Sequence, residues 1–328
     1  AAGPITRLRH HVVQRLESIL EDADTAAVIA AISVGARHAI TAEQWLRYAH
    51  SGTSHLMAIS GLHVGLAATA AWFLVVAGCA LLRNGGNHLR IAWLASLVTA
   101  AGYACLSGFA VPARRATLML FLLVLALLMS REPRPFVILA AACFLVVVID
   151  PLATLAPGFQ LSFAAVLLLL WLARRQAFVP TFSRIPRLAR GAIQLAAVQV
   201  FLLFGLFPLT VTNFGRVSFV APLVNFVAVP LFSVATVPLT LAGVMLDGPV
   251  AAAGDMALRA SGASIELLRW LIESALVIPN GAASTTLIDG FGGLCLVTIV
   301  AWVALPRAWP GRHAALLAMV VLVSDRVE

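Results

Sequence analysis

The stretch ATLMLFLLVLALLM, residues 116–129, decides the fold class, because it carries no charge and a single hydroxyl group. Arg114 and Arg115 precede it, and Arg131 follows it. A helix needs roughly 20 mostly apolar residues to cross the hydrocarbon core of a bilayer. With its flanks, the stretch therefore predicts a transmembrane helix over residues 115–130 that has basic residues at both ends.

The whole chain repeats this pattern. Apolar residues make up 61% of its 328 residues and charged residues only 11%, and the mean hydropathy is +0.98. Soluble domains average about 45–50% apolar and about 25% charged residues. We therefore predict an all-α, polytopic membrane helical bundle with spans near residues 60–82, 91–107, 115–130, 136–150, 158–173, 191–209, 217–246, 287–305 and 314–324.

The loops between the predicted spans alternate in charge. The basic loops contain Arg83 and Arg90, Arg131 and Arg134, five arginines between Arg174 and Arg190, and Arg307 with Arg312. The alternate loops contain a single basic residue, Arg216; these loops are 151–157, 210–216 and 279–286. Because short cytoplasmic loops are rich in basic residues, the arginine-rich loops are predicted to be cytoplasmic. Both ends of the chain then fall on the extracytoplasmic side.

The basic and sulfur-containing residues exclude several kinds of chemistry. All 22 basic residues are arginine, so the chain has no P-loop lysine for a nucleotide and no lysine amine for a Schiff base. The four cysteines, Cys79, Cys105, Cys143 and Cys295, lie singly in apolar runs and are predicted to be buried packing residues. We expect neither a metal site nor a cofactor.

Residues 1–50 differ from the remainder, because their apolar segments are too short to span a bilayer or are amphipathic. They predict an extracytoplasmic helical lead-in at the membrane surface, followed by a transmembrane domain over residues 51–328.

Two later segments depart from simple spans. Residues 217–246 carry three prolines, which break helix hydrogen bonding, and residues 255–278 are amphipathic. Either 217–246 is one kinked span followed by a spanning helix, or it is a re-entrant hairpin followed by an interfacial helix; we favour the hairpin.

Polar side chains enter the predicted spans in four segments, here called A to D. Polar groups inside a bilayer either join helices through hydrogen bonds or line a polar path. Both readings apply to each segment, and we favour the path. Segment A is SGTSHLMAISGLHVG (51–65), segment B is VPARRATLM (111–119), segment C is DPLATLAPGFQLSF (150–163), and segment D is NFGRVSFVAPLVN (213–225).

Two other functions use parts of the same segments. Ser60 and His63 suit an intramembrane serine hydrolase, in which the imidazole activates the hydroxyl. Known intramembrane serine proteases place the two on different helices, and Ser60 lies in Ala-Ile-Ser-Gly and not in Gly-x-Ser-Gly, which weakens this alternative. A small-solute transporter is the other alternative, although the inverted repeats of such folds are not evident in the sequence.

Taken in order and spacing, the four segments resemble the competence domain of the ComEC family of DNA-uptake proteins. The resemblance covers about residues 50–250, and the tail fits loosely. One departure stands at Val34-Gly35-Ala36, where family members often have Gly-Asp. The matching residues are SHLMAISGLHVGL (54–66), PARRATLM (112–119) and DPLATLAPGFQLSFAAV (150–166), with a weaker match in TNFGRVSFVAPLVNFVAVPL (212–231).

The resemblance implies a channel in the bacterial inner membrane that passes single-stranded DNA to the cytoplasm during natural transformation. It implies an outer-side DNA receptor and cytoplasmic single-strand-binding or motor proteins as partners, besides the lipid bilayer. Family members usually also carry an OB-fold domain and a metallo-β-lactamase-like nuclease domain. The H-x-H-x-D-H metal motif is absent from this chain, so we expect no enzyme activity. The residues expected to line the DNA path are His55, Ser60, His63, Arg114, Arg115, Asp150, Gln160, Ser162, Asn213 and Asn225.

Overall fold

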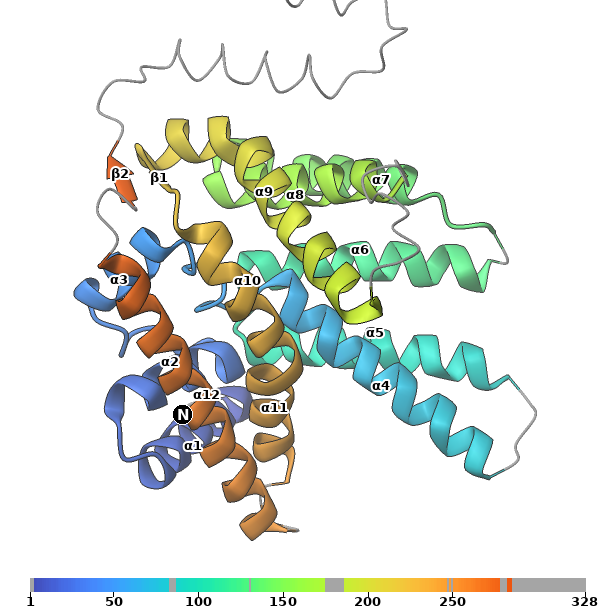
Figure 1. Ribbon diagram of the computed structural model, residues 1–328. Helices are drawn as coiled ribbons and strands as arrows, with labels where there is room; N and C mark the ends of the chain where they lie inside the picture. The colour runs from blue at the N-terminus through green and yellow to red at the C-terminus, as the bar shows by residue number, and fades with distance from the viewer. Residues whose placement is uncertain are drawn as a thin grey trace, which may run out of the picture.

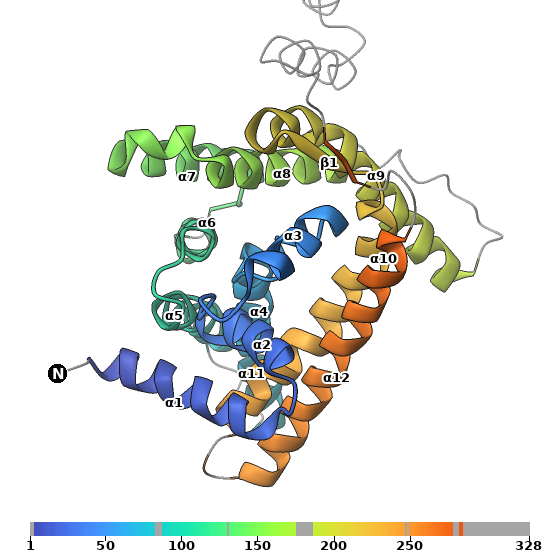
Figure 2. The same cartoon turned by 90° about the vertical axis from the view of Figure 1, so that its left-hand side faces the viewer.

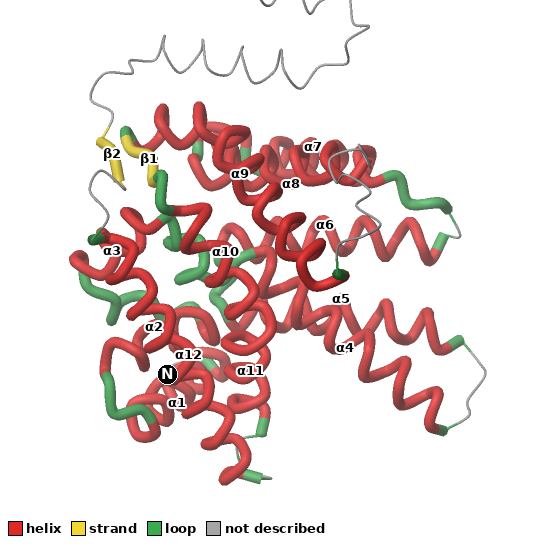
Figure 3. The backbone as a smooth tube through the Cα atoms, in the orientation of Figure 1, coloured by secondary structure: helices red, strands yellow, loops and turns green. Residues whose placement is uncertain are grey.

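The computed structural model describes residues 3–82, 87–129, 131–174, 186–246, 248, 250–277 and 282–284. Helices make up nearly all of this part of the chain (Figure 3). Two three-residue strands, β1 (Arg216–Ser218) and β2 (Ala282–Ser284), pair antiparallel. The all-α class is confirmed. The predicted spans 287–305 and 314–324, Cys295, and Arg83, Arg307 and Arg312 lie outside the described residues.

Three short helices open the described chain: α1 (Pro4–Ile19), α2 (Ala23–Val34) and α3 (Ala42–Ser51). Asp22 caps α2 by accepting a hydrogen bond from the amide of Thr25, and residues 25–34 of α2 are buried. Helix α3 begins with a capping box and ends at Gly52, which has a positive φ of 73°. A left-handed C-cap of this kind favours glycine.

Six long or apolar helices follow, and their bounds agree with the predicted spans to within a few residues. They are α4 (Gly61–Leu81), α5 (His88–Leu106), α6 (Val111–Leu128), α7 (Pro135–Ile149), α8 (Pro157–Arg174) and α9 (Arg187–Phe214), with a 3₁₀ turn at Pro151–Leu155. Figures 1 and 2 show α7 and α8 on one side of α6, with α5 and α4 on its other side. Among the described residues, six helices have the length and hydropathy of a membrane span: α4, α5, α6, α8, α9 and the helix over Ala221–Met245, whereas α7 is shorter. The chain is a multi-pass membrane protein.

The proline-rich segment is a single bent helix, so the predicted re-entrant hairpin is wrong. Helix α10 (Ala221–Leu231) continues through a π-helical turn (Phe232–Thr236) into α11 (Val237–Met245). Together they form one apolar helix of 25 residues. Proline removes an amide donor and crowds the preceding turn. The wider π turn lies between Pro230 and Pro238, and lets the helix continue past both.

Helix α12 (Ala251–Leu276) runs antiparallel along α10 and α11 (Figure 2). The hydroxyl groups of Thr240 and Ser261 lie 2.7 Å apart, as do those of Thr236 and Ser264. Nine residues of α12 are buried. The apolar face of α12 thus packs against other helices of the protein, and its predicted place in the membrane interface stays a prediction.

The largest apolar core joins the two ends of the described chain. It contains Leu16 of α1 and Ile29 of α2 together with Phe232, Leu258 and Leu268 of the later helices. Residues 1–50 thus pack against α10 to α12. Their assignment to a separate extracytoplasmic lead-in stays a prediction.

Two ion pairs fasten this core at its edge. The guanidinium group of Arg15 lies 2.7 Å from the carboxylate of Asp255, and that of Arg269 lies 2.7 Å from the carboxylate of Asp22. Each pair joins the first 22 residues to α12. Because the partners are partly exposed, each pair contributes specificity of packing more than stability.

Candidate functional site

Segments A to D, far apart in the sequence, form a closed ring of contacts at helix ends. Segment A holds the start of α4, B the start of α6, C the start of α8, and D the end of α9 with the start of α10. Each segment contacts the next, and D returns to A. We call this arrangement the ring. It is built from the same four segments that the sequence singled out, but their meeting follows from the fold.

The first half of the ring joins A to B and B to C. A Cβ atom placed on Gly61 would lie 3.5 Å from the Cβ of Ala116, so α4 and α6 approach closely where they begin. A Cβ atom placed on Gly158 would lie 3.6 Å from Nη2 of Arg115. The guanidinium group of segment B therefore lies against the first turn of α8.

The second half joins C to D and D to A. Nδ2 of Asn213 donates to Oε1 of Gln160 over 2.9 Å. Nδ2 of Asn225 lies 3.5 Å from the carbonyl oxygen of Gly52. A Cβ atom on Gly52 would lie 2.4 Å from the Cβ of Ala221, so only glycine allows the backbones to approach this closely. The ring closes at this contact.

Ser60 and His63 form a reciprocal capping box at the start of α4. The Ser60 hydroxyl accepts from the amide of His63 (3.4 Å), and Nδ1 of His63 accepts from the amide of Ser60 (3.3 Å). Each side chain thus bonds to the other's backbone. A hydrolase needs the hydroxyl to donate to the imidazole, so this geometry does not favour the hydrolase alternative.

The imidazole of His63 is fully buried and stacks on Phe232, with ring centroids 6.2 Å apart. Because Nδ1 accepts a hydrogen bond, the ring proton of the neutral imidazole lies on Nε2. Nε2 has no hydrogen-bond partner in the described part of the chain. The buried imidazole thus carries an unpartnered donor beside the π turn that begins at Phe232.

The two arginines of segment B have opposite surroundings. Arg114 is exposed. Arg115 is only 5% exposed, and its Nε has no partner among the described residues. Successive residues of a helix point about 100° apart, which turns one guanidinium group outward and the other toward α8.

Of the three predicted path residues in segment C, only Gln160 has a side-chain hydrogen bond among the described residues. Nε2 of Gln160 donates to the carbonyl oxygen of Thr154 (3.0 Å), and its Oε1 accepts from Asn213. Ser162 is half-buried two residues farther along α8, and Asp150 is exposed at the end of α7. Gln160 thus joins α8 to α9, whereas Asp150 lies apart from the ring contacts.

His55 and Asn225 meet at one backbone atom. Nδ1 of His55 lies 3.0 Å from the carbonyl oxygen of Gly52, which is also the partner of Asn225. Asn225 is buried, and its Oδ1 has no partner among the residues described. His55 itself is exposed. The sequence analysis did not identify Gly52 as a contact residue. Its position directly after an amphipathic helix was the signal that could have predicted a C-cap there.

Unpartnered buried polar atoms gather at the ring. In the described part of the chain they include Nε of Arg115, Nε2 of His63, Oδ1 of Asn225 and Oγ of Ser218, which lies beside Gly52. Helices α4, α6, α8 and α10 also begin there. Helix N-termini carry partial positive charge and C-termini partial negative charge, so the ring combines two arginines and four positive helix ends with the negative ends of α3 and α9.

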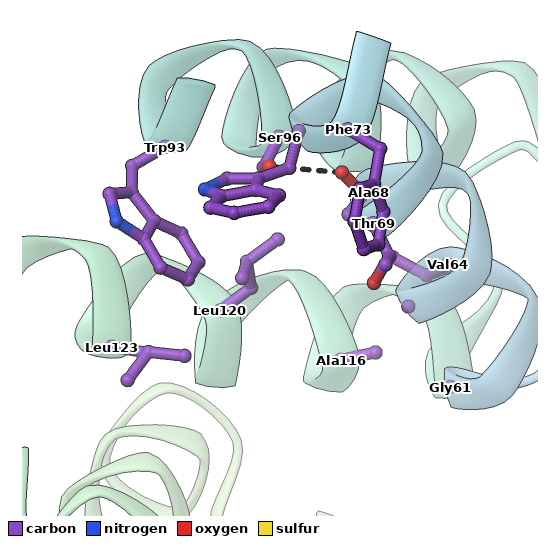
Figure 4. Close-up of a pocket in the computed structure, with 12 residues that line it drawn as sticks. Gly61, Val64, Ala68, Thr69, Phe73, Trp93, Ser96, Ala116, Leu120 and Leu123 are labelled. Carbon is purple, nitrogen blue, oxygen red and sulfur yellow. Dashed lines mark hydrogen bonds between the residues drawn. The ribbon is translucent and has the colours of Figure 1, made fainter. Parts of the chain in front are cut away.

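A cavity of about 440 Å³ lies next to the ring, between α4, α5 and α6 (Figure 4). Gly61 and Gly65 of segment A and Ala116 of segment B line it, together with Phe73 and Trp93. None of the ten residues predicted for the DNA path lines it. The cavity is mainly apolar, and we do not assign it to the path. Within the described residues, no group of three histidine, cysteine or acidic side chains is placed to hold a metal ion.

Comparison with known proteins gives the family of the chain. The sequence profile of the competence protein family matches residues 32–310. Similar proteins include the uncharacterized protein YcaI of Escherichia coli, 30% identical over 85% of this chain, and competence protein ComA of Neisseria gonorrhoeae, 30% identical over 93%. ComE operon protein 3 of Bacillus subtilis is 26% identical over 74% of the chain.

The matched regions make up only 36%, 42% and 29% of those three proteins, respectively, so the chain spans less than half of each relative. No solved structure matches the chain. The profile match covers most of the chain and includes all four segments of the ring. The chain belongs to the competence protein family.

Proposed function

We propose that this chain is the membrane channel through which single-stranded DNA crosses the bacterial inner membrane during natural transformation, and that the ring is its extracytoplasmic mouth. The observation that carries the proposal is the ring itself: four polar segments that are separate in the sequence meet, with unpartnered polar groups, at helix ends. The names of the relatives, competence protein and ComE operon protein, support a role in DNA uptake.

The charge of the ring suits a polyanion. A single strand is attracted by cations and by helix N-termini, and it is released only if the binding is weak. Two arginines at the mouth, one exposed and one buried, and uncharged Ser, His, Gln and Asn side chains fit that compromise. The ten predicted residues, His55 to Asn225, stay our proposal for the lining of the path.

The orientation follows from the arginine-rich loops. By the positive-inside rule, they predict that the starts of α4, α6, α8 and α10, and therefore the ring, lie on the extracytoplasmic side. A strand entering at the ring then leaves toward the basic cytoplasmic loops. We propose that an outer-side receptor delivers the DNA and that cytoplasmic single-strand-binding or motor proteins draw it in, because the chain has no lysine for a P-loop.

Three alanine substitutions test the proposal in the full-length protein, in a transformable strain that depends on it. Arg115→Ala, Gln160→Ala and Asn225→Ala are each expected to lower transformation about tenfold or more, because each removes a polar group of the ring. Thr240→Ala is the matched control, since Thr240 is buried and polar but bonds to α12. Membrane levels of all four proteins are measured by immunoblot. Normal transformation by all three ring variants would remove the proposed lining.

A further inference from the structure

Arg115 is a buried cation without a counter-charge. It is 5% exposed, and no hydrogen bond or ion pair of its side chain is found among the residues that the structure describes. The adjacent charge in the chain is Arg114, another cation. Burying an unpaired charge is costly, and buried charges in proteins are paired as a rule. An anion at this position would therefore be stabilised strongly.

The surroundings of Arg115 leave a place for that anion. Nη2 and Nη1 lie 3.6 and 3.9 Å from the position that a Cβ atom on Gly158 would occupy. Gly158 is exposed and lies in the first turn of α8. Glycine therefore puts no side chain against the guanidinium group on this side, whereas a larger residue would occupy that space.

The first turn of α8 adds a second source of positive potential. The amides of Phe159 and Gln160 bond to the carbonyl oxygen of Ala156, and Pro157 has no amide hydrogen. The amide of Gly158 precedes them at the positive end of the helix dipole. An oxyanion beside Gly158 would meet this amide and the guanidinium fork together, an arrangement that suits the two free oxygens of a phosphate diester.

We propose that Arg115 and the first turn of α8 form a binding site for one phosphodiester group of the single-stranded DNA in transit. This proposal rests on the proposed function and names the chemical group that the ring recognises. A single monoanionic contact binds the strand at the mouth without trapping it. A lipid phosphate is the less suitable ligand, because Arg114 is the exposed arginine of the two, whereas Arg115 is only 5% exposed.

The test uses the full-length protein in lipid nanodiscs and a fluorescent oligodeoxythymidylate, with binding measured by fluorescence anisotropy at several salt concentrations. Arg115→Gln is expected to weaken binding about tenfold, the effect of losing a charge-assisted hydrogen-bonded contact. The slope of log affinity against log salt should fall in magnitude by roughly 0.7, as for one phosphate contact on a single strand. Arg259→Gln is the control, because it removes an exposed arginine of α12 that lies outside the ring, and it should change affinity less than about twofold.

Gly158→Val keeps every charge but covers the guanidinium group, so it is expected to weaken binding in the same direction. This variant decides the matter if Arg115→Gln does not fold, as judged by its thermal melting. A strand with uncharged methylphosphonate linkages should bind the wild type and Gly158→Val equally weakly. Unchanged affinity and salt slope in Gly158→Val and Arg115→Gln would overturn the phosphodiester site.

Failure of this site and failure of the proposed function give different results. If Arg115→Gln binds the oligonucleotide normally and loses bound phosphatidylglycerol in native mass spectrometry, the site holds a lipid phosphate and our proposal is wrong. The transport function then still depends on the alanine series. If the wild type binds no single-stranded DNA, both proposals fail. Tenfold weaker binding in Arg115→Gln and Gly158→Val, with normal binding in Arg259→Gln, supports the site.

Discussion

Polar groups are buried both in the ring and in the seam, where the π turn and α11 pack against α12. The two regions differ in whether these groups have hydrogen-bond partners. In the seam, every buried hydroxyl group has a hydrogen-bond partner: Thr236 pairs with Ser264 and Thr240 pairs with Ser261, and the two serines also bond to backbone carbonyl oxygens. In the ring, Arg115, His63 and Asn225 each leave a buried polar atom unpartnered among the described residues. Buried polar groups in proteins are nearly always satisfied.

The difference separates polar groups that hold helices together from polar groups kept for another task. The seam hydroxyls satisfy one another, so their function is complete within the protein. The orphaned atoms of the ring are destabilising on their own, and that cost is explained if they serve a ligand. Substitutions in the seam should therefore change stability, and substitutions in the ring should change transport, which tests the distinction.

The largest expected effect is at the contact that closes the ring. Gly52→Ala places a Cβ atom 2.4 Å from the Cβ of Ala221, at a residue whose φ is 73°. Steric overlap and backbone strain should together destabilise the protein by about 3 kcal/mol. Thermal melting of the purified protein measures this loss, and transformation should fall with it.

Gly65→Ala is the control for that substitution. Gly65 lies in α4, and no heavy atom lies within 4 Å of its added Cβ. Alanine favours a helix interior over glycine by about 1 kcal/mol, so melting should be unchanged or higher. Equal melting temperatures for Gly52→Ala and the wild type would contradict the close approach of segments A and D.

A smaller effect is expected in the seam. Thr240→Val removes a hydroxyl that bonds to Ser261 and should lower the free energy of unfolding by about 1 kcal/mol, with little change in transformation. Asn225→Leu in the ring should lower transformation and change the free energy of unfolding less, because its Oδ1 has no bond to lose among the residues described and its Nδ2 contact with the Gly52 carbonyl oxygen is long, 3.5 Å. Melting and transformation are measured on both variants. The comparison breaks if both variants lose stability and neither loses transport.

The smallest effect concerns the ion pair of Asp22 at the edge of the core. Hydrogen bonding from Thr25 and the nearby charge of Arg269 lower the pKa of Asp22 below its ordinary value of 3.8, although burial opposes them. The contribution of Asp22 to the free energy of unfolding is therefore fully present above pH 3.8, and it is lost as the pH falls through the lower pKa of the folded state. Because the pair is partly exposed, the contribution is about 0.5 kcal/mol.

Melting curves from about pH 5 to about pH 2 measure this dependence. Asp22→Asn should melt lower than the wild type at the upper end, and the two should converge at the lower end. Thr25→Val is the companion variant, because it removes the side-chain hydrogen bond to Asp22 but keeps the Arg269 pair. A constant difference between Asp22→Asn and wild type across the whole range would contradict the assignment.

Hydropathy predicted the fold class and the described spans well, because each span is decided by its own residues. It did not predict the path of residues 217–246, since the prolines indicate breaks and do not show that a π turn can absorb them. It also did not place α2, whose burial depends on a partner face in α12 that is more than 200 residues away. Such pairing has no local periodic signal.

The site was predicted residue by residue and not as an arrangement. Segments A to D were identified from polar groups within apolar runs, yet Ser60 and His63 serve as a cap, and Gln160 joins two helices. Gly52 and Gly158 were missed as contact points, because the value of a glycine depends on what lies against it. The prediction that the ten residues line one path stays a prediction.

Photo-crosslinking during DNA uptake tests the central claim most directly. A benzoylphenylalanine is placed at Ser162 in the ring segment of α8, or at Val234, which is exposed on the bent helix beside the seam, in the full-length protein of a transformable strain. Labelled DNA is then supplied and the cells are irradiated. We predict DNA adducts at position 162 and none at position 234. Adducts at 234 without any at 162 would contradict a DNA path through the ring.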